Sequence, residues 1–168
     1  FVGAHPAVLP EETLKASPAI DWVGAKEFDY TCKEVCEDRP LDTVAGLSCR
    51  EQDGRIRHNA ARELIADMDA LPWVADVYKR DLEIERYAIG YLLHPYLSLY
   101  TGRGCPAQCT FCYKGIFGDK FRVRRPEKIV EEIKYLKHKF GIEEFAIIDD
   151  SFTSNPARAM EICDLLVS

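Results

Sequence analysis

Three cysteines, Cys105, Cys109 and Cys112, lie within eight residues of one another and are the side chains of this chain best suited to hold a metal centre. The ligand form of cysteine is the thiolate, and iron–sulfur clusters are commonly held by sets of thiolates. A four-iron cluster held by three cysteines keeps one iron open to a small chelating molecule. The spacing therefore indicates a cluster at which chemistry is done, as well as an electron relay.

Two other uses of these cysteines are weaker. A structural zinc site usually has four protein ligands, and no fourth Cys or His lies at a matching distance along the sequence. Disulfide bonds among three cysteines leave one thiol over and need an oxidising compartment. The flanking residues Gly102 and Gly104 let the backbone turn tightly and approach a ligand closely, which suits a metal-binding loop.

The composition describes a globular chain of one to two domains, with 168 residues, of which 47% are hydrophobic and 30% charged. No run of about 18 apolar residues is present, so we expect no transmembrane segment, and the first residues lack the order of a signal peptide. Seven cysteines, an odd number, favour a reducing cytosol and hence a cytoplasmic location. The net charge of −6 argues against DNA and general nucleic-acid binding.

One basic run, residues 120–125, departs from this acidic average. A solvated edge explains it most simply, and a surface that faces an anionic cofactor group is the alternative. The run comes shortly after the cysteine loop, so the position of its side chains in the fold decides whether it belongs to the metal site.

The first part of the chain alternates short apolar runs with short helical patterns. Residues 1–3 look like the end of a strand, residues 4–6 like a turn, and residues 20–24 like another short strand. Residues 10–15 carry acidic side chains early and a lysine late, as a short helix prefers, and a further helix is predicted around residues 30–37. This alternation is typical of a parallel α/β layer fold.

Cys32 and Cys36 are four residues apart and therefore share one face of the second of these helices. They are either buried small apolar residues or a second metal half-site. Further on, Asp53-Gly54 between two extended runs in residues 45–58 predicts a β-hairpin. Residues 61–78 suggest a short helix and then a loop. Because no clear periodicity persists over residues 60–96, we interpret them as an interdomain strap.

The second part of the chain repeats one order of elements. Residues 97–101 form a β-rich run that leads into the cysteine loop, and residues 126–140 predict a helix with Ile129, Ile133 and Leu136 on one face. Pro126 suits the first turn of this helix and Gly141 its end. Residues 145–148 are continuously apolar, as a strand covered on both faces should be.

An acidic loop, Asp149-Asp150-Ser151, follows this strand, and Asn155-Pro156 begins a last helix on which Met160 and Cys163 are expected to face the core. Two β-α units in succession are the opening of an α/β barrel, and such barrels carry their catalytic loops at the carboxyl ends of the strands. The stretch from Leu97 to Ser168 is far shorter than the roughly 200 residues of a whole barrel. Since the chain also begins with Phe1, we expect a fragment of a longer protein.

The cysteine spacing, with Phe111 before the last cysteine, resembles the signature of the radical S-adenosylmethionine (radical SAM) superfamily. The resemblance extends from about Tyr96 to the end of the chain. It implies that Cys105, Cys109 and Cys112 hold a [4Fe-4S] cluster on the loop after the first barrel strand. It also implies that the amino and carboxylate groups of S-adenosylmethionine chelate the open iron, and that the Phe111 region packs near the adenine.

The superfamily also places a motif at the end of the second strand, often Gly-Gly-Glu, that meets the methionine amino group. In this chain that place holds Asp149, Asp150 and Ser151. A carboxylate there can meet an ammonium group, so these three residues are candidate cofactor contacts. A solvated strand end or a helix-entry loop is the alternative.

The first part of the chain resembles the rear part of the cobalamin-binding domain that precedes this core in one large branch of the superfamily. The stretches that carry the resemblance are residues 2–6, 9–14, 21–23 and the hairpin of residues 45–58. That family usually has a Gly-Gly pair near the cobalamin, which makes Gly3 and Ala4 the candidate cobalamin contacts here.

The predicted fold class is therefore α/β, with three parts. The rear part of a Rossmann-like cobalamin-binding domain is expected at residues 1–59 and the interdomain strap at residues 60–96. The first two β-α units of a radical SAM partial TIM barrel are expected at residues 97–168.

A closer resemblance, to the HpnJ-type radical SAM proteins of hopanoid biosynthesis, comes from residues 77–82, 89–92 and 94–96 running into residues 100–105. It implies a small-molecule or lipid-like substrate, although residues 113–120 depart from that pattern. The expected function is reductive cleavage of S-adenosylmethionine with cobalamin assistance, for methyl transfer or ring rearrangement. A one-electron donor such as flavodoxin or ferredoxin is implied. A methylthiotransferase acting on RNA and a non-catalytic iron–sulfur redox module are the alternatives.

Overall fold

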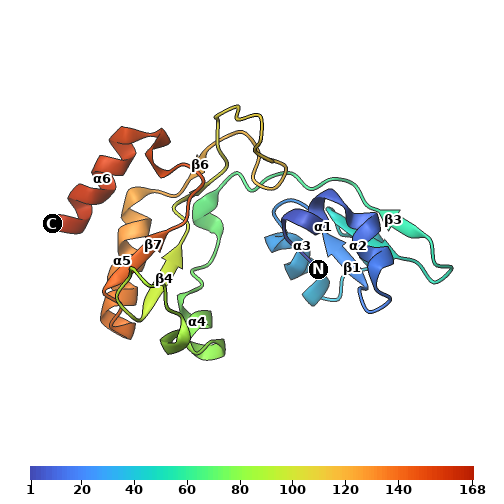
Figure 1. The fold of residues 1–168 in the computed structure, drawn as a ribbon, viewed down its shortest axis with the longest axis horizontal. Coiled ribbons are helices and arrows are strands. Elements are labelled where there is room, and N and C mark those ends of the chain that lie inside the picture. Colours follow the sequence, from blue (N-terminus) through green and yellow to red (C-terminus); the bar gives the residue numbers. More distant parts are fainter. The chain divides into compact units, whose positions relative to one another are not determined.

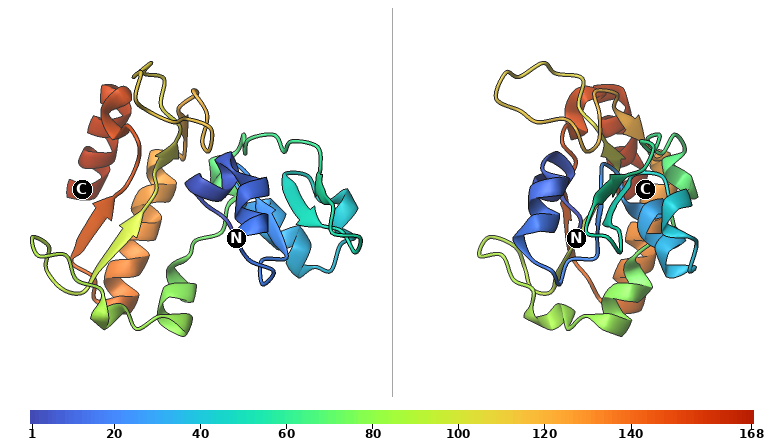
Figure 2. Two further views of the ribbon diagram at one scale, coloured as in Figure 1. Left: turned by 45° about the vertical axis from the view of Figure 1, so that its right-hand side comes forward. Right: turned by 90° about the vertical axis from the view of Figure 1, so that its right-hand side faces the viewer.

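The structure is a computed structural model that describes the backbone of residues 1–168 and all side chains except that of Lys79. Contacts within the chain divide it into two compact units (Figures 1 and 2). The first unit comprises Phe1–Ile65 together with Pro106–Asp119, and the second comprises Ala66–Cys105 together with Lys120–Ser168. No helix among the described residues is both long enough and apolar enough to cross a membrane.

The sheet of the first unit has three strands: β1 (Trp22–Gly24), β2 (Leu47–Arg50) and β3 (Ile56–His58). β2 and β3 form the hairpin that Asp53-Gly54 predicts, with Ser48 opposite His58. β1 also runs antiparallel to β2, so the prediction of a parallel layer is wrong for this pair of strands. The hairpin explains the antiparallel pairing of β2 with β3, because its short connection cannot form the long crossover that parallel neighbours need.

Phe1 lies beside β1, on the edge that does not pair with β2. Its ammonium group donates to Trp22 O over 2.9 Å, and its carbonyl accepts from Gly24 N over 2.9 Å. When the N–H and the C=O of one residue bond to the two neighbours of the residue opposite it, the pair forms a parallel bridge. Residues 1–3 are not assigned to a strand, yet Phe1 makes the contacts that a strand end would make.

The helices of the first unit are short. α2 (Pro10–Ala16) and α3 (Asp29–Cys36) confirm two predicted helices, and α1 (Ala4–Val8) stands where a turn was expected. A 3₁₀ turn, η1, covers Leu41–Thr43.

Two apolar clusters lie on the sheet of the first unit. Leu14, Ile20 and Val23 form one, and Val44, Leu47 and Cys49 form the other, against which Trp22 and Val35 pack. Neighbouring strand residues point to opposite faces, so Trp22 and Val23 place these clusters on the two faces of β1.

The apolar interpretation of Cys32 and Cys36 is wrong for Cys36, which is exposed, whereas Cys32 is half-buried. Helix α3 buries Thr31 completely and packs Val35 against the core. Since Thr31 and Val35 are also four residues apart, the buried face is offset by one position from the cysteines.

The second unit is built on a parallel pair of strands, β4 (Tyr96–Leu99) and β7 (Glu144–Ile147), with Leu97 opposite Phe145. Helices α5 (Pro126–Phe140) and α6 (Pro156–Val167) follow them and pack against each other. α5 begins at Pro126 as predicted and ends at Gly141, whose φ of 66° favours glycine. The predicted order of strand, loop, helix, strand, loop and helix is confirmed.

The prediction that Met160 and Cys163 face the core is wrong. Met160 is 61% exposed and Cys163 is exposed, while α6 buries Arg158, Ala159 and Ile162. Arg158 lies buried in the first turn of α6, and its polar contacts fix which face of the helix points inward. Hydrophobic periodicity does not reveal such contacts.

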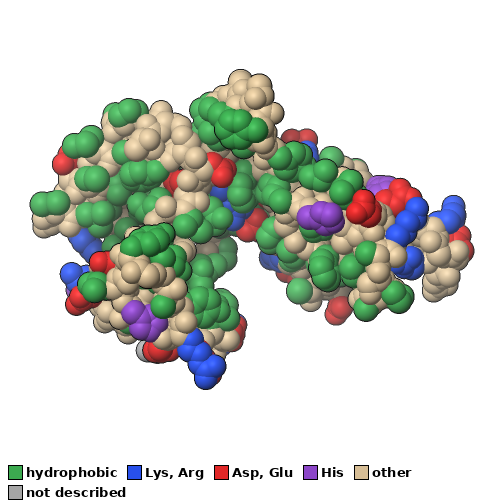
Figure 3. All heavy atoms as spheres, in the orientation of Figure 1, with side chains coloured by type: hydrophobic (Ala, Val, Ile, Leu, Met, Phe, Trp, Pro, Cys, Tyr) green, Lys and Arg blue, Asp and Glu red, His purple; other side chains and the backbone are tan. Residues whose placement is uncertain are grey.

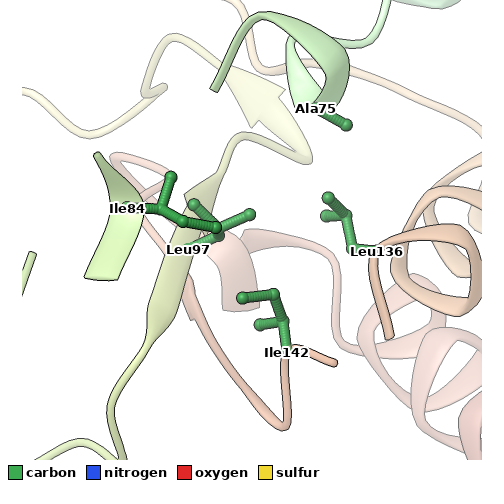
Figure 4. Close-up of a cluster of buried hydrophobic side chains, with 5 residues drawn as sticks. All are labelled: Ala75, Ile84, Leu97, Leu136 and Ile142. Atoms are coloured by element: carbon green, nitrogen blue, oxygen red, sulfur yellow. The ribbon is translucent and has the colours of Figure 1, made fainter. Parts of the chain in front are cut away.

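The core of the second unit draws on the strap as well as on the β-α units. Ala75 and Ile84 pack with Leu97, Leu136 and Ile142 (Figure 4). A second cluster contains Leu99, Ile129, Ile133 and Ile162. From Ala66 onward the strap therefore contributes to this unit through η2 (Met68–Ala70), α4 (Ala75–Asp81) and η3 (Ile84–Arg86).

Two very short antiparallel strands, β5 (Gly102–Arg103) and β6 (Arg122–Val123), connect the cysteine loop to the second unit. Gly102 lies opposite Val123 and Arg103 opposite Arg122. We call residues 100–103 and 122–124 the stem. The chain leaves the second unit and returns to it through this stem. A 3₁₀ turn, η4 (Phe152–Ser154), closes the loop after β7.

Candidate metal centre and its stem

The three cysteines of the loop are free thiols, of which Cys105 is half-buried and Cys109 and Cys112 are exposed. Cys112 N donates to Cys109 O over 3.1 Å, which closes a turn between the last two. Cys105 belongs to the second unit, and the other two belong to the segment that groups with the first unit. Among the residues that the structure describes, no three side chains of His, Cys, Asp or Glu lie close enough to share one metal ion.

The donor set nevertheless fits an iron–sulfur cluster. Three thiols free of disulfide bonds provide the soft ligands that such a cluster requires. Residues 106–113 are all exposed, so no core packing has to be broken when the thiolates close on a cluster. Gly104, with a φ of 84°, supplies a turn immediately before Cys105 that other residues adopt only under strain.

Asp149 binds the start of the stem. Its Oδ1 accepts a hydrogen bond from Thr101 N at 2.6 Å and one from Gly102 N at 3.1 Å. Thr101 Oγ1 donates to its Oδ2. The structure therefore brings this candidate residue to the cysteine loop and gives its carboxylate three donors there. A contact between Asp149 and a cofactor amino group stays a prediction.

Arg158 binds both arms of the stem. Its Nη2 donates to Thr101 O over 2.7 Å, and its Nε and Nη2 donate to Arg124 O over 3.3 and 3.2 Å. The residue is only 6% exposed. Burial lowers the pKa of Arg158 from its ordinary value, and the nearby charge of Asp149 opposes that shift.

Arg124 ties the returning arm to helix α5. Its Nη1 lies 2.6 Å from Glu132 Oε2 and donates to Tyr100 O over 3.1 Å. Both partners of the ion pair are largely buried, so Arg124 is neither a solvated edge nor free to face a cofactor. Arg125, in contrast, is exposed and pairs with Asp69 of the strap over 2.7 Å.

The other candidate residues have differing local surroundings. Phe111 is 91% exposed and Asp150 is exposed, while the Ser151 hydroxyl bonds to that of Ser154. Gly3 has a φ of 115°, a conformation that favours glycine, and Ala4 is the exposed first residue of α1. Exposed hydrophobic side chains such as Phe111 occur on both units (Figure 3). The cofactor roles of these residues stay predictions.

The second unit also contains a cavity of about 230 Å³ that the sequence did not indicate. The strap residues Leu71, Pro72 and Tyr78 line it together with Tyr100 and Arg103 of the stem. Residues of the strap thus lie next to the stem of the cysteine loop.

Comparison with known proteins identifies the second part of the chain, because the family model described as "Radical SAM superfamily" matches residues 99–167. These residues belong to the radical SAM superfamily. The match includes all three loop cysteines, the whole stem, Asp149 and Arg158.

Longer similarities run across both units. Uncharacterized methyltransferase PH0819 of Pyrococcus horikoshii is 34% identical over 166 residues, which cover 95% of this chain and 35% of that protein. An anaerobic magnesium-protoporphyrin IX monomethyl ester cyclase of Cereibacter sphaeroides is 36% identical over 180 residues, covering 99% of this chain and 28% of that protein. The chain thus spans about a third of the length of these curated relatives.

Among solved structures, the cobalamin-dependent radical SAM enzyme OxsB, with aqua-cobalamin and S-adenosylmethionine bound, has a similar fold. The TM-score is 0.69 at 21% identity, with 99% of this chain and 24% of that chain covered. The α/β fold of the chain is therefore that of enzymes in the cobalamin-dependent branch of the radical SAM superfamily.

The roles of Arg124, Glu132 and Arg158 at the stem were missed by reasoning from sequence alone. One signal was available. Glu132 interrupts the apolar face of α5 between Ile129 and Ile133, and it is 3% exposed. A carboxylate on a buried helix face requires a cationic partner, and the neighbouring basic run could have supplied it. Arg158 carried no comparable signal.

Proposed function

We propose that this chain is part of a cobalamin-dependent radical SAM enzyme. Cys105, Cys109 and Cys112 would hold the [4Fe-4S] cluster. The observation that carries the proposal is this cysteine triad, mounted on the carboxyl end of β4 within the radical SAM match. Catalytic loops of α/β barrels lie at that end of their strands. The similarity of the whole chain to OxsB supports the cobalamin part.

The proposal assigns residues 1–59 to the rear part of a Rossmann-like cobalamin-binding domain, with Gly3 and Ala4 near the corrin. Residues 97–168 would open a partial TIM barrel, and residues 60–96 would join the two. The parallel pairing of β4 with β7 and the two β-α units support the barrel assignment. The parallel-type hydrogen bonds of Phe1 to β1 support the Rossmann-like assignment.

In the loaded enzyme the chemistry comes from the cofactors. When bound, the cluster and S-adenosylmethionine would supply radical chemistry, in which reductive cleavage of S-adenosylmethionine would start the removal of a hydrogen atom from the substrate. The residues of this chain bind and orient. The three thiolates would ligate irons, Asp150 and Ser151 would meet the methionine moiety, and the exposed ring of Phe111 would cover the adenine and exclude water.

The reaction class that we propose is methyl transfer or ring formation on a small molecule. Its relatives are named a methyltransferase and a cyclase, and the net charge of −6 disfavours an RNA substrate. A lipid-like substrate of the hopanoid type and a flavodoxin or ferredoxin as electron donor follow from the resemblance of residues 77–105. We further propose a cytoplasmic location.

Anaerobic reconstitution of the full-length protein tests this function. The parent protein should bind about four irons and form 5′-deoxyadenosine when S-adenosylmethionine and dithionite are added. Cys109→Ala should abolish that product, whereas Cys163→Ala, at an exposed cysteine of α6, should leave it unchanged. A parent protein that holds the cluster but forms no 5′-deoxyadenosine would instead be a redox module. A parent that binds zinc in place of iron would refute the proposal.

A further inference from the structure

The stem of the cysteine loop is held by side chains that lie about fifty residues away in the sequence. Between Tyr100 and Gly102 the backbone polar groups are paired one after another. Tyr100 O accepts from Arg124, Thr101 O accepts from Arg158, and Thr101 N and Gly102 N donate to Asp149. In ordinary loops many such groups are left to water, so this segment is fixed unusually well.

We infer that Asp149 and Arg158 act as a clamp that positions Cys105, so that this cysteine is a preorganised ligand. Both are positioning residues, because they act on the backbone before Cys105 and not on a reacting atom. The part of the inference that concerns the cluster rests on the function proposed above.

The fold delivers both members of the clamp to the stem. Asp149 lies just beyond β7, whose pairing with β4 continues through the hydrogen bond from Ile148 N to Leu99 O at 3.1 Å. Arg158 lies in the first turn of α6, where its own N–H is capped by Asn155 Oδ1 at 3.1 Å. The same β-α unit therefore supplies the acceptor for the N–H groups of the stem and the donor for its carbonyls.

The chemistry of Arg158 suits the task. A guanidinium presents several N–H donors in a rigid planar fork, and here the fork reaches the carbonyls of Thr101 and Arg124, one on each arm of the stem. A lysine has a single side-chain nitrogen at the end of a flexible alkyl chain and cannot hold both arms of the stem in one plane. The Arg158 guanidinium also lies over the Phe121 ring, 5.9 Å from its centroid.

Stability alone does not explain this arginine. Its Nη1 is buried and has no hydrogen-bond partner in the structure, and an unsatisfied buried donor costs about 1–3 kcal/mol. An apolar side chain at this place in α6 would avoid that cost, although Arg124 O would then lose the donors that Arg158 supplies. The arrangement is instead what a residue selected for the geometry of two backbone segments would show.

The influence of the clamp ends at Cys105. Thr101, Gly102 and Gly104 are buried, Cys105 is half-buried, and every residue from 106 to 113 is exposed. We therefore expect the protein to hold Cys105 before any cluster binds. Cys109 and Cys112, beyond the reach of the clamp, should acquire their positions when the cluster binds.

The first test uses the full-length protein without its cluster and needs no activity. The rate at which iodoacetamide alkylates each cysteine is measured by mass spectrometry in the parent, Arg158→Gln, Arg158→Lys and the control Met160→Gln, which changes an exposed residue of the same helix. Alkylation of Cys105 should accelerate about tenfold in both Arg158 variants, since local opening becomes easier. The rates of Cys109 and Cys112 should change less than about twofold. Equal rates for Cys105 in all four proteins would overturn the inference.

The second test examines the reconstituted protein by electron paramagnetic resonance of the reduced cluster, with and without S-adenosylmethionine. Arg158→Lys should keep its iron and its melting temperature, yet show an altered spectrum and form 5′-deoxyadenosine about 100-fold more slowly, as for a misplaced reactive group. Iron content, spectrum and rate all equal to those of the parent would contradict the clamp. If the parent itself forms no 5′-deoxyadenosine, the proposed function fails, while the alkylation test still decides the clamp.

A third variant decides the matter if the Arg158 variants do not fold. Thr101→Val removes the hydroxyl donor to Asp149 and keeps the side-chain volume, and Thr101→Ser restores that donor. Alkylation of Cys105 should accelerate in Thr101→Val and return to the rate of the parent in Thr101→Ser. No difference between these two variants would contradict a positioning role for the contact between the Thr101 hydroxyl and Asp149.

Discussion

The stem of the cysteine loop and the segment that carries its last two cysteines are built in opposite ways. In the stem, Thr101 and Gly102 are buried and bound by Asp149, Arg158 and the returning arm. Residues 106–113 are exposed throughout, and their backbone contacts include the local turn from Cys112 N to Cys109 O. The protein thus specifies the stem by its own interactions, whereas we expect the cysteine segment to receive its order from the cluster that it binds.

The largest effect is expected where the stem is tied to α5. Arg124→Met leaves Glu132 as an unpaired carboxylate on a buried helix face, and removal of one partner of a buried ion pair costs about 3–5 kcal/mol. Native-state hydrogen exchange of the α5 amides in the full-length protein should register this loss. As a matched control, Lys15→Met removes the partner of Glu11, a pair whose side chains are 65% and 56% exposed, and should have no measurable effect. Equal exchange in the two variants would show that the stem is not held from α5.

A second prediction concerns the cysteine segment. If its order comes from a bound cluster, trypsin should cleave near Lys114 about 100-fold more slowly after anaerobic reconstitution than before, because ligand binding suppresses the open state. Cys109→Ala should remove this protection, and Cys163→Ala should keep it. Cleavage sites in the second unit serve as internal controls, since their rates should not change. If the cluster-free protein already resists cleavage near Lys114, the cysteine segment is ordered without a cluster, and the proposed difference between the stem and this segment is wrong.

A smaller effect is expected from a single methyl group in the stem. A Cβ at Gly102 would lie 2.8 Å from the Phe121 ring and 3.0 Å from Arg122 O, so Gly102→Ala should force the two arms apart at a cost of about 1–3 kcal/mol. Gly90→Ala is the control, because no heavy atom lies within 4 Å of its Cβ position. Thermal melting of the two full-length variants gives the comparison. The close approach required of Gly102 is to a ring of the protein itself, where the sequence had suggested a ligand.

The two β-α units of the second unit show why part of this fold was predictable from the sequence. Ile129, Ile133 and Leu136 recur at helical spacing between Pro126 and Gly141, and residues 145–148 form an uninterrupted apolar run. Both signals are local, and α5 and β7 follow them within one or two residues. The hairpin of β2 and β3 was announced in the same way by Asp53-Gly54.

The clamp was not predictable, because it depends on contacts between residues far apart in the sequence. Thr101 is 48 residues from Asp149 and 57 from Arg158. Hydrophobic periodicity carries no information on a buried arginine, which is also why Met160 and Cys163 were placed on the wrong face of α6. The cysteine triad was recognisable from its spacing alone, but the residues that hold its stem could be found only from the fold.

The smallest effect is expected at the exposed contact between the strap and α5, which contrasts with the buried stem. Lys139 Nζ and Tyr135 Oη donate to Asp76 Oδ1 over 2.8 and 2.5 Å, and these hydrogen bonds, the one from Lys139 foremost, lower the pKa of Asp76 from its ordinary value. A lowered pKa means that the contact adds stability above the unfolded-state pKa of about 3.9 and loses it as the pH falls through the folded-state value. The Trp73 ring lies 5.7 Å from that of Tyr135, so its fluorescence should change in this acid range in the parent and not in Asp76→Asn. Because Asp76 is exposed, the change should weaken at high salt. A transition that resists salt, or that persists in Asp76→Asn, would show that another group causes it and would contradict this prediction.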